Sequence, residues 1–217
     1  MSLPGAVAHD GSTAGPEVLA AVLSDAVRAL AGAGVRFALI GGLASASWGR
    51  PRCSSDIDLL LDARDAALAL AALSDAGFRT EETNPIWLFK AFRDDILVDL
   101  LFKSKGEIYL DDEMQKRVQL RSVHGEPMPV LAPEDLVVMK ALAHDEEAPR
   151  HWFDALALVA CCSLDWGYLL ARARKGPLRL LSLVAYASSL GLAVPDGVLP
   201  ALHALCRGEG AERMSGS

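Results

Sequence analysis

The sequence has few of the features that mark membrane, secreted or broadly nucleic-acid-binding proteins. No apolar run reaches the ~18 residues of a spanning helix, and the segment Met1 to Gly15 lacks the basic region and apolar core of a secretory leader. The four cysteines show neither C-x-x-C spacing nor a metal-finger pattern, which favours reduced thiols in the cytoplasm. A net charge of -7 argues against broad coating of nucleic acid, because such binding depends on many Lys and Arg contacts to phosphate.

With 217 residues, of which 52% are hydrophobic, the chain can bury either one large core or an α/β domain and a smaller helical one. Helical periodicity dominates after Pro133, whereas short apolar runs separated by turn residues are common before it. We therefore expect an α/β (α+β) fold, in which a domain with a small mixed β-sheet precedes a C-terminal helical subdomain. The expected boundaries are 1–15 for a flexible N-terminus, 16–132 for the sheet domain, 133–207 for the helical subdomain and 208–217 for a flexible tail.

The spacing of apolar residues predicts the individual strands and helices. Strands are expected at 36–40, 56–62, 86–92 and 96–102, with a last short pair within 119–130 and a short helix between the first two. Longer helices are expected at 16–33, 63–76, 107–118, 133–144, 150–162, 165–175, 177–190 and 195–207. Asp62 is expected to cap the helix that follows it, Asp94 and Asp95 to occupy a hairpin turn, and residues 144–149 to form a solvated loop.

Two acidic residues interrupt a strongly apolar strand. Asp56 and Asp58 are two residues apart, so their side chains lie on the same face of an extended chain. Carboxylates that close repel each other unless a proton or a cation lies between them, and Mg²⁺ prefers oxygen ligands of this kind. Asp99 interrupts a second apolar run and supplies a third acid. Singly, each acid is also compatible with a solvated strand end or an arginine partner, but together they predict a metal site.

A glycine pair precedes the acids at a strand-to-helix turn. Gly41 and Gly42 end the strand at 36–40 and are followed by the small residues of a short helix. Glycines there let the backbone approach a ligand, and the N–H groups that open the helix favour an anion such as phosphate. A glycine pair alone is usually only a turn. Beside a metal-binding acid pair, however, it predicts phosphoryl or nucleotidyl transfer, in which two cations clamp the attacking and leaving oxygens.

These residues resemble the nucleotidyltransferase superfamily with the DNA polymerase beta-like fold. The resemblance rests on Ile40-Gly41-Gly42, a spacer of thirteen residues, Asp56-Ile57-Asp58, and the later Asp99. The approach from Gly49 to Asp56 is similar to a small bacterial branch, which includes abortive-infection toxin-like nucleotidyltransferases and aminoglycoside and lincosamide nucleotidyltransferases. Gly42 stands where many relatives have Ser, so only a backbone N–H would contact phosphate at that position.

The resemblance implies a Mg²⁺-dependent enzyme that transfers an NMP from an NTP to an acceptor hydroxyl and releases pyrophosphate. Asp56 and Asp58 would bind two Mg²⁺ ions that hold the triphosphate, while Asp99 would bind the second ion and help to deprotonate the acceptor. The implied nucleotide-binding residues are Gly41, Gly42, Arg50, Arg52, Ser54 and Lys140. The acceptor would be a tRNA, a protein or a small hydroxylated molecule, and a toxin-like member would have an antitoxin-like partner.

Two other functions remain open from the sequence. One is a non-catalytic nucleotide-binding or interaction partner that retains the fold, although such a protein has no need to keep three mutually repelling acids. The other is a metal-dependent phosphohydrolase, which would need further ligands, and His124 and His144 are poorly placed for this by the predicted elements. Arg150 and Asp154, four residues apart on one predicted helix, are expected simply to pair with each other.

Overall fold

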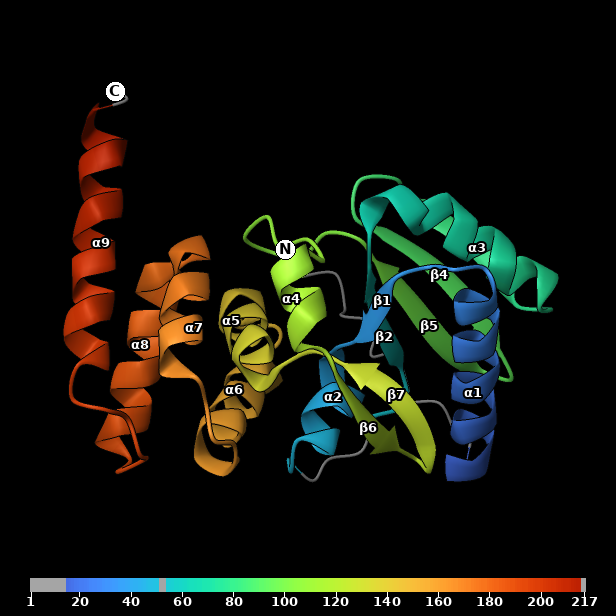
Figure 1. Cartoon of the computed structure of the whole chain (residues 1–217), viewed down its shortest axis with the longest axis horizontal. Helices are drawn as coiled ribbons and strands as arrows, with labels where there is room; N and C mark the ends of the chain where they lie inside the picture. The colour runs from blue at the N-terminus through green and yellow to red at the C-terminus, as the bar shows by residue number, and fades with distance from the viewer. Residues whose placement is uncertain (1–14, 51–53, 216–217) are drawn as a thin grey trace, which may run out of the picture.

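A mixed seven-stranded sheet and a series of helices make up the computed structural model, which describes residues 15–50 and 54–215, with the backbone alone from 209 onward (Figure 1). The strands are β1 (Phe37–Leu39), β2 (Ile57–Leu61), β3 (Arg79–Asn84), β4 (Leu88–Arg93), β5 (Ile96–Leu101), β6 (Gln119–Val123) and β7 (Glu126–Val130). The helices are α1 (Pro16–Gly32), α2 (Gly41–Ser47), α3 (Ala66–Asp75), α4 (Asp112–Arg117), α5 (Pro133–Ala143), α6 (Arg150–Cys161), α7 (Trp166–Arg172), α8 (Pro177–Ser189) and α9 (Val198–Ser215), with short 3₁₀ turns η1 (Ala63–Asp65) and η2 (Ala173–Lys175).

The strand order β3-β4-β5-β2-β1-β7-β6 makes β2 and β5 neighbours, although a helix and two strands separate them in the sequence. β2 and β5 run parallel, as do β1 and β7, while the other neighbouring strands are antiparallel. Alternate side chains of the two strands, Leu59 and Leu61 in β2 with Val98 and Leu100 in β5, are fully buried on one face. The intervening residues therefore project from the other face, where the predicted acids lie.

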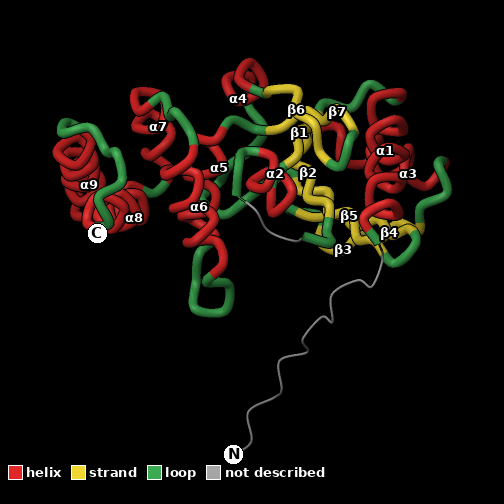
Figure 2. Tube along the Cα trace, turned by 90° about the horizontal axis from the view of Figure 1, so that it is seen from below, coloured by secondary structure: helices red, strands yellow, loops and turns green. Residues whose placement is uncertain are grey.

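Helices cover both faces of the sheet, with α1 and α3 on one side of the strands and α2 on the other (Figure 2). The buried residues of α1 recur at helical spacing: Leu19, Val22, Leu23, Ala26 and Leu30. Burying each leucine side chain stabilises the fold by about 1.5–3 kcal/mol, so this stripe fixes α1 firmly on the core. The opposite face is thereby left for α2 and the polar residues beside it.

The helix α5 is the centre of the C-terminal helices. Nine consecutive residues, Pro133 to Ala141, are buried, and α5 packs against α6, α7 and α8. A helix that is buried on all sides acts as the core of its layer. The remaining helices lie progressively farther from the sheet, ending with α9 at one end of the molecule (Figure 1). Of the helices in the described residues, none is at once long and apolar enough to cross a membrane.

A buried polar network joins these helices to the loop before α4. Asp135 of α5 accepts a hydrogen bond of 2.8 Å from the Tyr168 hydroxyl, and the Arg172 Nε lies 2.9 Å from its other oxygen. Arg172 also forms an ion pair of 2.6 Å with Asp111. Because a buried carboxylate is stable only when it is paired, this network fixes the relative positions of α4, α5 and α7.

Most predicted elements are confirmed, with three corrections. The last helix, predicted over 195–207, begins at Val198 and continues to Ser215, past the predicted start of the tail. The helix predicted from residue 107 begins only at Asp112, because Asp111 accepts a hydrogen bond of 2.8 Å from the Met114 N–H and caps it, while turns and a β-bridge precede it. Strand β3 has no counterpart among the predicted elements, since its sequence is polar on both faces. The hairpin turn at Asp94 and Asp95 is confirmed by their φ angles of 50° and 61°.

Candidate active site

Two of the three predicted acids lie directly opposite each other on neighbouring strands. Asp58 of β2 pairs in register with Asp99 of the parallel strand β5. Side chains at paired positions project from the same face, and neighbouring strands are ~4.8 Å apart, so the two side chains are close neighbours. Asp56 lies just before β2 and is exposed to solvent. The fold therefore brings all three predicted acids to one face near the beginning of β2.

Gly41 makes room for one of these carboxylates. Its φ of +70° is in the left-handed region, and a Cβ atom at this position would lie 1.8 Å from Asp58 Oδ2. The Ile40 N–H donates a hydrogen bond of 2.9 Å to the Asp58 carbonyl, which holds the two segments together. The Asp58 side chain therefore requires a glycine at position 41. This requirement is separate from the predicted one, which is that glycine lets a phosphate approach the backbone. Gly42 follows in the first turn of α2 and is buried.

Asp99 is a poorly solvated carboxylate, and no cation of the described residues donates a hydrogen bond to it. Its side chain is 20% exposed, its Oδ1 atom has no hydrogen-bond partner, and the Lys90 Nζ lies 3.9 Å from that atom, which is too long for a hydrogen bond. Burial, followed by the charge of Asp58, raises the pKa of Asp99 to about 6; Lys90 opposes the shift and Asp56 adds to it. A carboxylate in this state is destabilising unless it is protonated or shares a cation.

The acids suit a hard divalent cation by their chemistry. Three carboxylates offer the oxygen donors that Mg²⁺ prefers, and no donor within residues 15–50 and 54–215 bonds to Asp99 Oδ1. Within the residues that the structure describes, no three Asp, Glu, His or Cys side chains already converge to hold a metal ion. Two of the acids, Asp58 and Asp99, are nevertheless paired and form the core of a candidate metal site. Asp56 would complete the site from the adjoining segment.

A lysine continues the same row of the sheet. Lys90 of β4 pairs with Asp99, and Glu81 of β3 pairs with Lys90, so the row that starts at Asp58 crosses four strands on one face. Lys90 is missing from the predicted site, although it interrupts the apolar run 86–92 much as Asp99 interrupts 96–102. A single charge within an apolar strand is therefore the signal that identifies both residues.

Two of the predicted phosphate-binding cations share a buried aspartate. Asp154 of α6 is fully buried; it forms an ion pair with Arg50, and its Oδ2 atom lies 2.7 Å from the Lys140 Nζ of α5. Burial lowers the pKa of Arg50. Sequence spacing points to Arg150 as the partner of Asp154, whereas its partners include Arg50 and Lys140, because α2, α5 and α6 pack together. Contact of either cation with a nucleotide stays a prediction.

The other predicted phosphate ligands lie in the segment that leads to the acids. Ser54 is partly buried. Its neighbour Ser55 lies 3.3 Å from the Asp56 carboxylate through its hydroxyl. Arg52 lies outside the described residues, so its contact with phosphate also stays a prediction.

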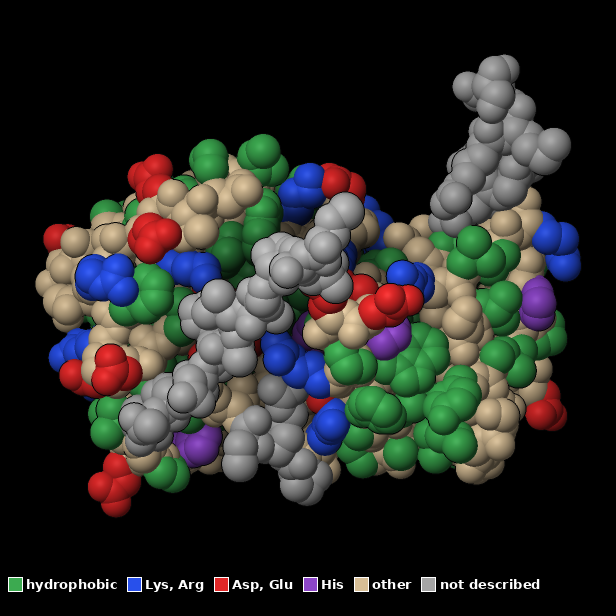
Figure 3. Space-filling model, turned by 180° about the vertical axis from the view of Figure 1, so that it is seen from behind, with side chains coloured by type: hydrophobic (Ala, Val, Ile, Leu, Met, Phe, Trp, Pro, Cys, Tyr) green, Lys and Arg blue, Asp and Glu red, His purple; other side chains and the backbone are tan. Residues whose placement is uncertain are grey.

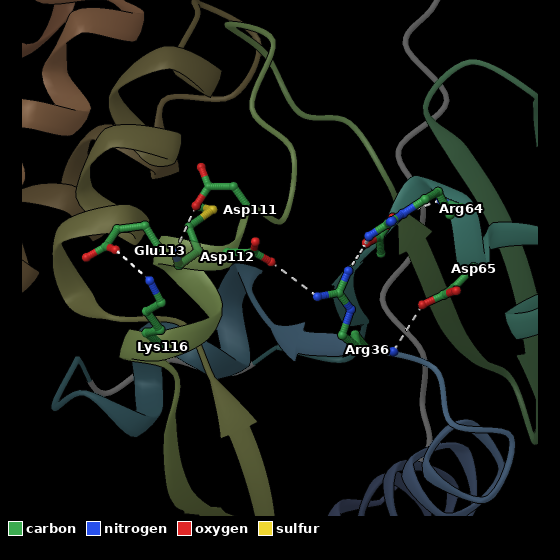
Figure 4. Close-up of polar contacts among 9 residues, drawn as sticks. Arg36, Arg64, Asp65, Asp111, Asp112, Glu113 and Lys116 are labelled. Atoms are coloured by element: carbon green, nitrogen blue, oxygen red, sulfur yellow. Dashed lines mark hydrogen bonds and ion pairs between the residues drawn. The ribbon is translucent and has the colours of Figure 1, made fainter.

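The opposite end of β2 carries a second charged cluster with a structural role (Figure 4). Asp62 accepts hydrogen bonds from the Arg64 N–H at 3.0 Å and the Arg64 guanidinium at 2.7 Å, and it is ion-paired with Arg36. These interactions, chiefly the side-chain hydrogen bond from Arg64, hold the pKa of Asp62 well below its usual range. Arg36 also lies 3.3 Å from Asp112 of α4. The predicted helix cap is confirmed, and the cluster connects α4 to the sheet.

Solved structures of known proteins share this fold. In solution, the antibiotic-resistance factor ANT(2'')-Ia has a structure that matches with a TM-score of 0.58 at 19% sequence identity, over 81% of this chain and 100% of that chain. A crystal structure of ANT(2'')-Ia in complex with adenylyl-2''-tobramycin matches with a TM-score of 0.54 at 20% identity, over 73% of this chain and 97% of that chain. At these identities the likeness shows the fold alone. No curated protein matches the sequence.

A family model described as "Uncharacterised nucleotidyltransferase" matches residues 8–190. This range contains the glycine turn, the acid trio, Lys90 and the buried Asp154 with its two cations. The match covers well over half of the chain, and it agrees with the resemblance found in the sequence. The chain therefore belongs to this family of nucleotidyltransferases, and the protein is a transferase enzyme.

Proposed function

We propose that the protein transfers a nucleoside monophosphate from an NTP to an acceptor hydroxyl, with Asp56, Asp58 and Asp99 as its catalytic carboxylates. The observation that carries the proposal is the direct pairing of Asp58 with Asp99 on adjacent central strands. Two like charges at paired positions destabilise a sheet, and Asp99 Oδ1 is orphaned besides. Such an arrangement is explained by a ligand that both carboxylates share.

The transfer would form a bond between the acceptor oxygen and the α-phosphorus and break the bond to the β-phosphate, so pyrophosphate leaves. Two Mg²⁺ ions, when bound, would neutralise the phosphate oxygens in this displacement. Asp56 and Asp58 would hold the ions that bind the triphosphate, and Asp99 would hold the second ion and help to take up the acceptor proton. Asp99 suits this role because its buried Oδ1 atom accepts no hydrogen bond from the part of the chain that the structure describes.

The phosphates would be held by the N–H groups of Gly41 and Gly42 at the start of α2. Ser54, Arg50, Arg52 and Lys140 would assist, with Arg50 and Lys140 oriented by Asp154. Lys and Arg side chains border the middle of the face shown in Figure 3, between the sheet and the C-terminal helices. Local positive charge is thus available to a triphosphate in spite of the net charge of -7.

The test begins with calorimetric binding of each NTP, with and without Mg²⁺, and continues with release of pyrophosphate and transfer of labelled nucleotide. The Asp58→Asn variant should lose transfer by about 100-fold or more, since a preorganised charge acts mainly on the transition state. Glu82→Gln, an exposed change on β3, is the matched control and should keep full activity. Equal transfer by Asp58→Asn and the wild type would overturn the assignment of the acids.

The acceptor is proposed to be a tRNA, a protein or a small hydroxylated molecule. The solved complex of ANT(2'')-Ia contains adenylyl-2''-tobramycin, which makes hydroxylated small molecules the first class to screen. Total tRNA and a lysate of proteins follow, each with labelled NTP and with Asp58→Asn as the blank. If the acceptor is a tRNA or a protein, an antitoxin-like partner should suppress the toxicity of the expressed wild type and have no effect on cells that express Asp58→Asn.

A further inference from the structure

Two neighbouring cysteines lie against the segment that leads from α2 to the acids. Cys161 is the last residue of α6 and Cys162 follows it, with their Sγ atoms 3.8 Å apart. Both thiols donate to one acceptor, the Trp48 carbonyl, at 3.4 and 3.5 Å. Trp48 caps the C-terminus of α2, two residues before Arg50. Two sulfur atoms and one carbonyl oxygen, all of which can bind a metal ion, are therefore brought together from two distant parts of the chain.

These three atoms form a triangle of the size that one face of a tetrahedral metal site requires. Two thiolates that bind Zn²⁺ at ~2.3 Å in tetrahedral geometry are ~3.8 Å apart, and a thiolate and an oxygen ligand are ~3.6 Å apart. The observed separations are 3.8, 3.4 and 3.5 Å. Because these separations already match, binding needs little movement of the sulfur atoms.

The surroundings of the cysteine pair are accessible and favour positive charge. Cys161 is exposed and Cys162 is partly exposed. The pair lies at the C-terminus of α6, which is the negative end of the helix dipole, and no basic residue in the last turn of α6 offsets this charge. Arg121 is a nearby cation, but its guanidinium lies over the Trp48 ring at 3.9 Å and donates to the Ser47 carbonyl. Burial, followed by Cys161, raises the pKa of Cys162 to about 12, while Arg121 lowers it and Glu134 adds to the rise.

We propose that Cys161, Cys162 and the Trp48 carbonyl form a binding site for a thiophilic divalent cation such as Zn²⁺ or Cd²⁺. On binding, each S–H bond is replaced by a sulfur–metal bond and both protons pass to solvent, without oxidation or reduction. Water fills the fourth position. The site differs from the carboxylate site in kind, because thiolates select soft cations whereas carboxylates suit Mg²⁺.

The bound cation would hold the segment that precedes the acids. Gly49 packs on Cys161, since a Cβ at Gly49 would lie 3.5 Å from the Cys161 Sγ. The next residue, Arg50, is ion-paired with the buried Asp154. A cation at the Trp48 carbonyl therefore fixes one end of this short segment while Asp154 fixes the other. Occupancy should raise the melting temperature without any nucleotide present.

The experiment titrates the reduced full-length protein with Cd²⁺ in excess Mg²⁺, which competes for the carboxylates but not for the thiolates. One Cd²⁺ per chain is expected, with thiolate-to-metal charge-transfer absorption and release of about two protons. Cys161→Ser and Cys162→Ser should each weaken binding by about tenfold or more, because each removes one of two sulfur ligands. Cys206→Ser is the matched control and should bind as the wild type does.

Two results would overturn the proposal. One is a wild type, folded by circular dichroism, that shows no charge-transfer absorption with Cd²⁺. The other is equal Cd²⁺ affinity in Cys161→Ser and the wild type; this variant is decisive because Cys161 is exposed and serine keeps a donor for the Trp48 carbonyl. Asp99→Asn should retain Cd²⁺ binding, so the outcome here is independent of the proposed nucleotidyl transfer.

Discussion

The Asp99→Asn variant should be more stable than the wild type when no divalent cation is bound. In the wild type, burial and the neighbouring Asp58 raise the pKa of Asp99 from 3.8 to about 6. One pKa unit corresponds to about 1.4 kcal/mol, so the ionised Asp99 lowers the free energy of unfolding at neutral pH by up to about 3 kcal/mol. Asn keeps the shape without the charge. Loss of the weak contact with Lys90, at 3.9 Å, offsets a few tenths, so a net gain of about 1–2 kcal/mol is expected.

The pH dependence gives this effect a sign. Because folding raises the pKa, the folded protein binds the Asp99 proton more tightly than the unfolded chain does. The stability that this proton contributes is fully present below about pH 4 and is lost as the pH rises to about 6. The variant has no such loss, so its advantage should grow from near zero at about pH 4 to its full value above about pH 6. Asp135, whose pKa burial also raises to about 6, affects both proteins equally.

The measurement is urea unfolding in EDTA across the range from about pH 4 to about pH 8, for the wild type, Asp99→Asn and the control Glu82→Gln. Glu82 is exposed on β3, so its change should alter stability by less than about 0.5 kcal/mol. The reasoning is refuted if Asp99→Asn is no more stable than the wild type at any pH, or if its advantage does not change with pH.

Three further changes test neighbouring parts of the structure. Gly41→Ala should destabilise the protein by about 1–3 kcal/mol, because its Cβ would lie 1.8 Å from Asp58 Oδ2 at a left-handed φ, and a double-mutant cycle with Asp58→Ala should show strong coupling. Asp154→Ala should cost about 3–5 kcal/mol in urea unfolding, since it leaves two cations beside a buried vacancy. Tyr168→Phe should cost about 1–3 kcal/mol by removing the hydrogen bond to Asp135, with melting temperature as the readout.

The acid trio could be predicted because its signal is local. Two acids two residues apart in an apolar strand, and a third acid that interrupts another apolar strand, stand out against the near-continuous apolar runs of buried strands. Their register could not be predicted in the same way, because Asp58 and Asp99 meet through parallel pairing of strands that are not consecutive. Strand β3 could not be predicted for a different reason. Its sequence is polar because it lies at the edge of the sheet, where neither face needs to be apolar.

The partners of Asp154 show the same limit more sharply. Local spacing favours Arg150, which lies four residues earlier on the same helix, whereas Arg50 reaches Asp154 from 104 positions away. No helix propensity or periodicity encodes such a contact, because it depends on the packing of α2 against α6. Burial of one carboxylate then selects two cations, since a single charge pair would leave oxygen lone pairs unsatisfied.

Repulsion between two carboxylates at the centre of the sheet lowers the stability of the protein, and a sheet with a purely structural role would avoid it. Asp58 and Asp99 put like charges at paired positions of central strands. The Asp58 carboxylate fits only because residue 41 is a glycine and has no Cβ atom. The ionised Asp99 alone lowers the free energy of unfolding by up to about 3 kcal/mol. A ligand present at a hundred times its Kd raises the free energy of unfolding by ~2.7 kcal/mol, which is close to this value. The folded protein should therefore depend on a ligand of this site for stability in a way that Asp99→Asn does not. A rise in melting temperature that divalent cations cause in the wild type, and that is much smaller in the variant, would report on the site before any acceptor is known.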